Sequence, residues 1–179
     1  MSKMFFQLTS LILFAAGAAM LAIISGCADP AASRAVQIEA VREVFPSATD
    51  ISRISTIRDV PAAGRPGNPI VSEIRDSSGL LGYCVESEVV GRSGPFRIRV
   101  LFDKQLGIER VAVVSYPWSH GRDVRKSAFT KQFEGKGPDD AIRIGKDIDA
   151  MSGATISSTA MAKGIREAVE LLTLVNAPS

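Results

Sequence analysis

The chain has 179 residues, of which 46% are hydrophobic and 6% aromatic, and its 21 basic and 19 acidic side chains leave a formal net charge of +2. Nucleic-acid binding usually requires a clustered basic excess, so this charge balance argues against a nucleic-acid partner. One His and two Cys supply too few nitrogen and sulfur ligands for a structural zinc site, and we expect no bound metal. The length is that of one domain large enough to bury a core.

The first 27 residues carry the pattern of a membrane address. Lys3 precedes an uncharged apolar run over residues 5–24, which is the order of a secretory signal peptide. The run ends in Ile-Ser-Gly-Cys, which resembles a bacterial lipobox, so Cys27 is the expected lipidation site of a lipoprotein. The alternative is an uncleaved transmembrane helix, because about 23 residues at about 1.5 Å each span the roughly 30 Å hydrocarbon core. Both interpretations anchor the protein to a membrane and place its domain in the periplasm or at the cell exterior.

Two elements are expected before the main sheet. Apolar residues at helical spacing predict a helix over residues 33–45, which Pro46 ends. Isoleucines from Ile51 to Ile57 then indicate a strand-like stretch that breaks at the Pro- and Gly-rich residues 61–69.

Four further strands are expected, separated by short Gly-containing turns, over residues 70–76, 80–90, 96–102 and 108–116. Strands joined by such short turns must be antiparallel, because parallel neighbours need a longer crossover. In the third of these strands apolar residues alternate with Arg97 and Arg99, which predicts a meander with one buried and one wet face. In the second, Cys84 is expected to be an unpaired, small buried residue, and a disulfide between Cys27 and Cys84 is the alternative.

Helical spacing returns over residues 122–133 and in a last helix of about 17 residues that begins near Ser157 and ends before Pro178. The basic residues of the first stretch are interpreted as a solvated face, and docking of an anionic redox partner is the alternative. The expected fold class is α+β, with an antiparallel sheet, as a meander or half-barrel, flanked by helices. A tether over residues 28–34 would lead into this single domain over residues 35–175.

The junction before the last helix carries the chemistry. Asp149 is followed by a turn of small residues, Ser152, Gly153 and Ala154, and then by the hydroxyl of Thr155. Small residues let another molecule approach the backbone closely. Free N–H groups and the positive end of the helix dipole favour a phosphate at such a point. The Thr hydroxyl is therefore placed to be joined to a phosphate.

This pattern resembles the flavinylation motif of the FMN-binding domain family, in which the Thr hydroxyl is esterified to the phosphate of FMN. The match is complete over residues 149–155 and continues through Ile156, Ser157 and Ser158 into the helix. Other parts of the family's sheet, and of the segment before its motif, are similar to residues 82–83, 94–95, 103–107 and 132–136. The resemblance covers residues 70–172.

The resemblance implies that Thr155 is the attachment point of covalent FMN and that no residue of the mature protein is catalytic. A Mg-dependent flavin transferase would use FAD as donor and release AMP. The transferase would recognise the motif residues, and their backbone would cradle the phosphate: Asp149, Ser152, Gly153 and Ala154, with Ile156 and Ser157 beyond them. Related domains include the small flavin-carrying subunits of Rnf- and Nqr-type redox complexes.

The loop after the last strand departs from the family pattern. Subunits of ion-pumping complexes usually carry a Glu-Thr-Pro-Gly type loop where this chain has Tyr-Pro-Trp-Ser-His-Gly-Arg, and the change favours a stand-alone electron carrier. On the resemblance, Tyr116 and Trp118 would pack against the flavin ring, while His120 or Arg122 would stabilise negative charge on reduced flavin. Ordinary core packing is the alternative for the two aromatic residues, and a solvated loop position is the alternative for His120.

The function that the sequence favours is a membrane-anchored extracytoplasmic flavoprotein that carries FMN on Thr155 and transfers electrons between redox partner proteins. An electron-transfer protein is favoured over a self-sufficient enzyme because the sequence shows no second cofactor site. One alternative is a flavin-dependent reductase that acts on a small acceptor. The other is a lipoprotein binding module whose motif is never modified.

Overall fold

The computed structural model describes residues 30–54 and 69–177, and the chain divides into two units, residues 1–40 and 41–179. The predicted signal peptide, the predicted lipobox with Cys27 and the stretch from residue 55 to residue 68 lie outside the described residues. In the described ranges no helix combines the length and the hydropathy that a membrane crossing requires.

Helix α2 (Pro30–Arg42) begins and ends three residues earlier than the predicted helix 33–45. Proline is well suited to the first helical position, because the missing N–H would have no partner there. The helix ends in a turn where the amides of Val44 and Phe45 donate to the carbonyl oxygen of Val41, over 3.0 and 2.9 Å. Phe45 precedes Pro46, and a residue before proline avoids helical backbone.

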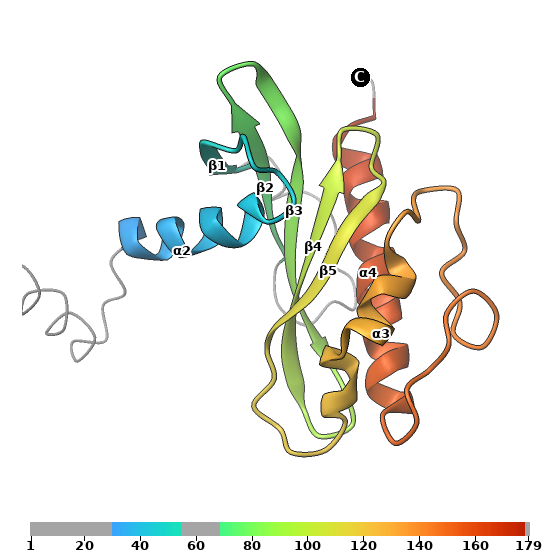
Figure 1. Cartoon of the computed structure of the whole chain (residues 1–179). Helices are drawn as coiled ribbons and strands as arrows, with labels where there is room; N and C mark the ends of the chain where they lie inside the picture. The colour runs from blue at the N-terminus through green and yellow to red at the C-terminus, as the bar shows by residue number, and fades with distance from the viewer. Residues whose placement is uncertain (1–29, 55–68, 178–179) are drawn as a thin grey trace, which may run out of the picture. The chain divides into compact units, whose positions relative to one another are not determined.

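The described residues form a five-stranded antiparallel sheet in which the strands follow one another in chain order, β1-β2-β3-β4-β5 (Figure 1). The strands are β1 (Asp50–Arg53), β2 (Ile70–Asp76), β3 (Gly79–Val90), β4 (Pro95–Asp103) and β5 (Ile108–Ser115). The meander is therefore confirmed, with β1 as a fifth strand at one edge. Tight turns join β2 to β3 and β4 to β5, because Asp76 and Asp103 each accept amide hydrogen bonds from the residues that follow them.

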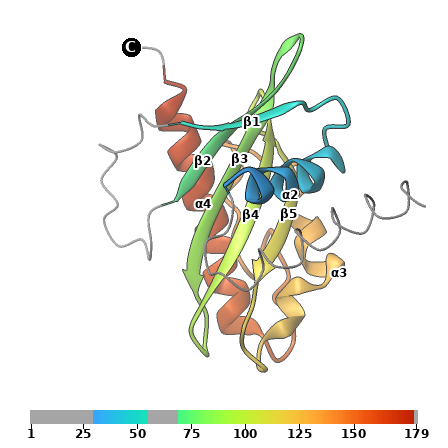
Figure 2. The ribbon, with the colours of Figure 1, turned by 90° about the vertical axis from the view of Figure 1, so that its left-hand side faces the viewer.

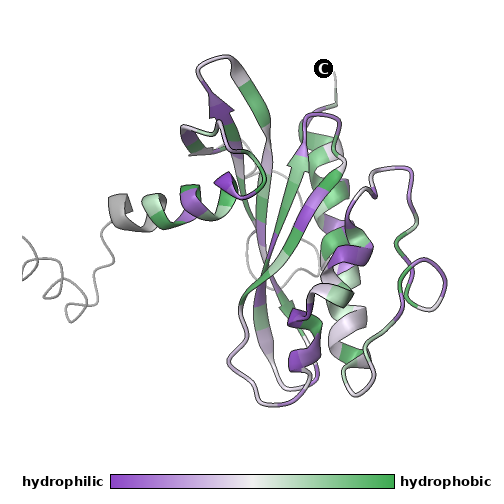
Figure 3. Cartoon of the chain, viewed as in Figure 1, coloured by the Kyte–Doolittle hydropathy of each residue, from purple (hydrophilic) through white to green (hydrophobic). Residues whose placement is uncertain are grey.

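Helix α4 (Thr155–Val175) runs along one face of the sheet, as Figures 1 and 2 both show. The core lies between this helix and β3 and β4, where Val85, Ile98, Met161 and Ile165 are fully buried. The helix sits close to the sheet at Gly164, because a Cβ on this residue would lie 2.3 Å from Cγ1 of Val89. Hydrophobic and hydrophilic residues alternate along the strands, as expected for a sheet with one core face (Figure 3).

The opposite face of the sheet is not wet throughout, which corrects the prediction of a solvated face. Leu101, Cys84 and Ile74 point away from the main core and are nevertheless buried, with exposed fractions of 3% or less. The segment after α2 covers part of this face, since a Cβ on Gly82 would lie 3.1 Å from the ring of Phe45. A short apolar segment outside the strand pattern thus completes a second, smaller core.

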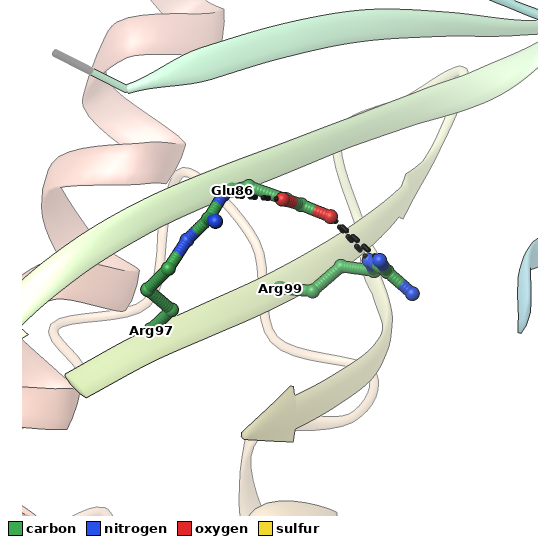
Figure 4. A network of polar contacts seen from close by, with 3 residues as sticks. All are labelled: Glu86, Arg97 and Arg99. Atoms are coloured by element: carbon green, nitrogen blue, oxygen red, sulfur yellow. Dashed lines mark hydrogen bonds and ion pairs between the residues drawn. The ribbon is translucent and has the colours of Figure 1, made fainter. Parts of the chain in front are cut away.

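Arg97 and Arg99 do point to this second face, where they pair with one buried carboxylate (Figure 4). Glu86 of β3 is only 6% exposed. Arg99 donates to its Oε1 from Nε and Nη2 over 2.8 and 2.6 Å, and Nη2 of Arg97 donates to Oε2 over 2.9 Å. A buried carboxylate is costly unless it is paired, so the two arginines make Glu86 tolerable inside the sheet.

The predicted helix over residues 122–133 is replaced by three short pieces, η2 (Arg122–Arg125), α3 (Ser127–Thr130) and η3 (Lys131–Phe133). The break falls at Lys126, whose φ of −68° and ψ of 138° are extended. Burial explains the bend, because Val124, Phe129 and Phe133 are all fully buried and the two phenylalanine rings pack edge to face with centroids 5.3 Å apart. A straight helix would not direct all three side chains into the core.

Cys84 is free within the described residues and is 3% exposed, as predicted for a small buried residue. Burial raises the pKa of its thiol to about 12; the Arg99 guanidinium opposes this rise and the Glu86 carboxylate adds to it. The thiol is therefore protonated and unreactive in the folded protein at neutral pH.

We predict that Cys84 makes stability pH-dependent only in alkaline solution. Its folded pKa lies above the unfolded value of 9.0, so its contribution is fully present below about pH 9 and is lost as pH rises towards 12, where only the unfolded chain releases the proton. Two proteins are compared, the Cys27→Ser variant and the Cys27→Ser, Cys84→Ala double variant. The measurement is the difference between their unfolding free energies, taken at pH 7 and again at pH 10.5. A difference that does not shrink at the higher pH contradicts the assignment.

Candidate functional site

The motif over residues 149–155 forms a tight turn that ends at the start of α4. The amide of Ala154 donates to the carbonyl oxygen of Met151 over 2.9 Å, which closes the turn. Gly153 has a φ of 74°, in the left-handed region that other residues rarely adopt, and in the described structure a Cβ there would meet no atom within 4 Å. Its conformation, and not a lack of space, therefore explains the glycine.

Thr155 is the first residue of α4, and its side chain is exposed. Ala154 occupies the cap position and is 4% exposed; within the described part of the chain no side chain caps this helix end. The first N–H groups of a helix have no partner in the helix itself, and Ala cannot supply the oxygen that a Ser or Asp cap would offer. The end of α4 beside Thr155 is consequently a favourable position for an anion.

Gln132 holds the beginning of the motif in place. The amide of Asp149 donates to its Oε1 over 2.7 Å, and its Nε2 donates to the carbonyl oxygen of Asp149 over 3.2 Å. At the other end, the amide of Met151 donates to Oγ of Ser158 over 3.1 Å. The turn is thus fastened to η3 on one side and to α4 on the other.

A hollow of about 560 Å³ lies at this end of α4. Three segments line it: the turn between β3 and β4, the loop after β5, and the motif with the first turn of α4. The lining residues are Arg92, Ser93, His120, Gly121, Gly153, Ala154, Thr155, Ile156 and Ser157. Six of these nine residues were predicted from the sequence: His120, Gly153, Ala154, Thr155, Ile156 and Ser157. The structure thus brings His120 next to the motif, which lies about 30 residues later in the chain.

No sequence signal points to Arg92 and Ser93, whereas Gly121 belongs to the loop over residues 116–122 that the resemblance places beside the flavin ring. The turn from Gly91 to Pro95 was recognised as a turn, but its side chains carried no chemical signal. What brings it to the site is the length of β3 and β4, which extends the hairpin to the end of α4. Among the nine described lining residues one side chain, Arg92, carries a permanent charge and none is acidic, so the hollow favours an anionic ligand.

Five predicted residues do not line the hollow: Tyr116, Trp118, Arg122, Asp149 and Ser152. Tyr116 is 9% exposed and packs against Phe96 with ring centroids 4.9 Å apart. Nε1 of Trp118 donates to the carbonyl oxygen of Pro95 over 2.8 Å, and its ring covers Gly94, where a Cβ would lie 2.3 Å from it. These two aromatic residues support the walls of the hollow from behind.

His120 is exposed, and its Nδ1 lies 3.1 Å from Oγ of Ser119. Its carbonyl oxygen accepts a hydrogen bond of 2.7 Å from the hydroxyl of Tyr116. The backbone at this position is therefore fixed while the ring stays accessible to a ligand in the hollow.

Comparisons with known proteins match this part of the chain. A model described as "FMN-binding domain" matches residues 91–170, which include all nine lining residues. The chain is 30% identical over 153 residues to a subunit of the proton-translocating ferredoxin:NAD(+) oxidoreductase complex of Clostridium ljungdahlii, covering 80% of this chain and 76% of that protein. It is also 30% identical over 146 residues to a subunit of the ion-translocating oxidoreductase complex of Methanosarcina acetivorans, covering 75% and 73%.

We predict that Gln132→Ala loosens the motif without unfolding the domain. The substitution removes both hydrogen bonds to the backbone of Asp149, so the unfolding free energy should fall by about 1 kcal/mol and the Asp149 amide should exchange with solvent about ten-fold faster. Hydrogen exchange followed residue by residue measures this, with Gln105→Ala on the β4–β5 turn as the control. An unchanged exchange rate at Asp149 would show that Gln132 does not hold the motif.

Proposed function

The chain belongs to the FMN-binding domain family, and on this premise we propose that it carries FMN covalently on Thr155 and transfers electrons between redox partner proteins outside the cytoplasm. The observation that carries the proposal is the exposed Thr155 at the first position of α4, in the lining of a hollow of about 560 Å³. Ligand sites of this kind usually measure a few hundred to about 1,000 Å³.

The residues of the hollow fit such a group in charge and in polarity. The open N–H end of α4 and the guanidinium of Arg92 suit a phosphodiester, and the described lining brings no carboxylate against it. Ile156 is 56% exposed and lines the hollow, where its apolar side chain suits contact with an aromatic ring system. Tyr116 and Trp118 contribute by supporting the walls.

Attachment would join the Thr155 oxygen to phosphorus. The bond between the two phosphates of FAD would break, AMP would leave and the hydroxyl proton would be lost, with a Mg-dependent flavin transferase catalysing the exchange. Once attached, FMN supplies electron exchange in single or paired steps. The chain's own residues bind the phosphate, fix the backbone of His120 and exclude water from one side of the site.

The names of the two related proteins indicate the class of partner. Both are named as components of ion- or proton-translocating oxidoreductase complexes. We propose that this chain likewise exchanges electrons with partner proteins, and the changed loop over residues 116–122 favours a carrier outside such a pump. Co-purification from native membranes distinguishes a component of a complex from a free carrier.

A second candidate function is a flavin-dependent reductase that acts on a small acceptor. The observation that favours it is the exposed ring of His120 in the lining of the hollow, where it could meet a substrate over the flavin. Steady turnover of a small acceptor with one reductant and no partner protein would support this alternative, and its absence would support the carrier.

We predict that co-expression with a flavin transferase adds the mass of FMN to the wild-type protein and that Thr155→Ala abolishes the adduct. Thr155→Ser keeps a hydroxyl and should retain part of it. Thr159→Ala is the matched control, because Thr159 lies one turn further along α4 and its Oγ1 only donates to the carbonyl oxygen of Thr155. Intact-mass analysis measures the adduct. No adduct on the wild type would leave the unmodified binding module as the function.

We propose further that Cys27 carries the membrane anchor. Processing before Cys27 and its acylation should give a membrane-bound mature protein, whereas Cys27→Ser should accumulate as a longer, unlipidated precursor. Mass spectrometry of the N-terminal peptide, together with membrane fractionation, measures both. If the variant keeps the full N-terminus and the wild type does as well, the transmembrane-helix alternative holds.

A further inference from the structure

Two buried hydroxyl groups join the walls of the hollow. The hydroxyl of Tyr116 donates to the carbonyl oxygen of His120 over 2.7 Å and lies 3.2 Å from Oγ of Ser157. Tyr116 is 9% and Ser157 1% exposed, so this contact is shielded from water. It connects the loop after β5 to the first turn of α4.

Two glycines show how closely the segments meet at Ser157. Gly121 has a φ of 80°, and a Cβ on it would lie 2.5 Å from Oη of Tyr116 and 2.8 Å from Oγ of Ser157. A Cβ on Gly91, in the turn between β3 and β4, would lie 2.7 Å from the same Oγ. Three segments of chain therefore converge on one hydroxyl with no room for a methyl group. Each of them also lines the hollow.

The other tyrosine provides a comparison within the molecule. The hydroxyl of Tyr83 donates to Oδ1 of Asn176 over 2.6 Å, just beyond the last residue of α4. Tyr83 is 6% exposed, and so is about as buried as Tyr116. Both hydroxyls thus tie α4 to the rest of the fold, but only Tyr116 does so at the end that carries Thr155.

We infer that Tyr116 is a positioning residue of the proposed flavin site, whose hydroxyl clamps residues 116–121 against the first turn of α4. This inference rests on the proposed function for the identity of the ligand. The clamp sets the position of His120 and Gly121 relative to Thr155, and so sets how closely the wall covers a group attached there. The resemblance also places Ser157 at the cofactor, and the hydroxyl of this residue contacts Tyr116.

The change to test is the loss of a single hydroxyl. Tyr116→Phe keeps the ring that packs on Phe96 and removes the donor to the carbonyl oxygen of His120. The loop after β5 therefore loses this hydrogen bond while the core keeps its volume. Ser157→Ala removes the other side of the contact. Because both changes break one clamp, the double variant should do no more than the stronger single variant.

On protein that carries FMN, collisional quenching of flavin fluorescence by iodide measures how well the wall covers the ring. Quenching should increase in Tyr116→Phe and in Ser157→Ala and stay at the wild-type level in Tyr83→Phe, even if Tyr83→Phe lowers the melting temperature by as much. Equal quenching in Tyr116→Phe and the wild type, or an equal increase in Tyr83→Phe, overturns the inference.

Hydrogen exchange tests the clamp in protein without flavin and so separates its failure from that of the proposed function. The amides of Val124 and Ser158, which donate to the carbonyl oxygens of Gly121 and Ala154, should exchange about ten-fold faster in Tyr116→Phe than in Tyr83→Phe. If they exchange equally fast in the two variants, the clamp does not exist, whether or not FMN is attached. If they differ but the wild type never gains an FMN adduct, the clamp stands as a structural feature and the assignment to a flavin site is overturned.

Discussion

The close packing of α4 on the sheet is the constraint on which the site depends. Gly164 lets the helix approach β3 until a Cβ would lie 2.3 Å from Val89. Buried side chains along the helix then fix its rotation, and with it the point at which its first turn emerges. Thr155 can face the β3–β4 turn and the loop after β5 only because the whole helix is held at this depth.

Two groups of charged or polar atoms in the fold differ in whether the protein itself supplies their partners. On the second face of the sheet, Glu86 is buried and is neutralised by Arg97 and Arg99, so its charge is satisfied inside the protein. At the end of α4 the opposite holds, because an uncapped helix start and Arg92 meet in a lining without a carboxylate. The ion pairs of Glu86 therefore need no ligand, whereas the start of α4 favours an anion that only a ligand would supply.

Local patterns predicted the strands well, since each of the four expected strands lies within one residue of its observed bounds. Short turns with Asp and Gly leave the chain little choice there. The stretch over residues 122–133 was predicted as a helix, and it bends at Lys126 because three side chains enter the core from one short segment. Alternation places Leu101 on the face that was expected to be solvated, yet Leu101 is 3% exposed and the segment around Phe45 covers part of this face. Contacts with distant segments decided both outcomes.

The sequence by itself determined the antiparallel order of the strands, the family and the position of Thr155 at the mouth of a helix, because turn residues, periodicity and a short motif are all local. Tertiary structure alone decided what surrounds that Thr. It brought Arg92 and Ser93 into the lining, moved Tyr116 and Trp118 behind the wall, and turned the hydroxyl of Ser157 towards Tyr116. The physical reason is that these placements follow from the depth at which α4 packs on the sheet and from burial, which depend on contacts between distant segments and leave no local trace.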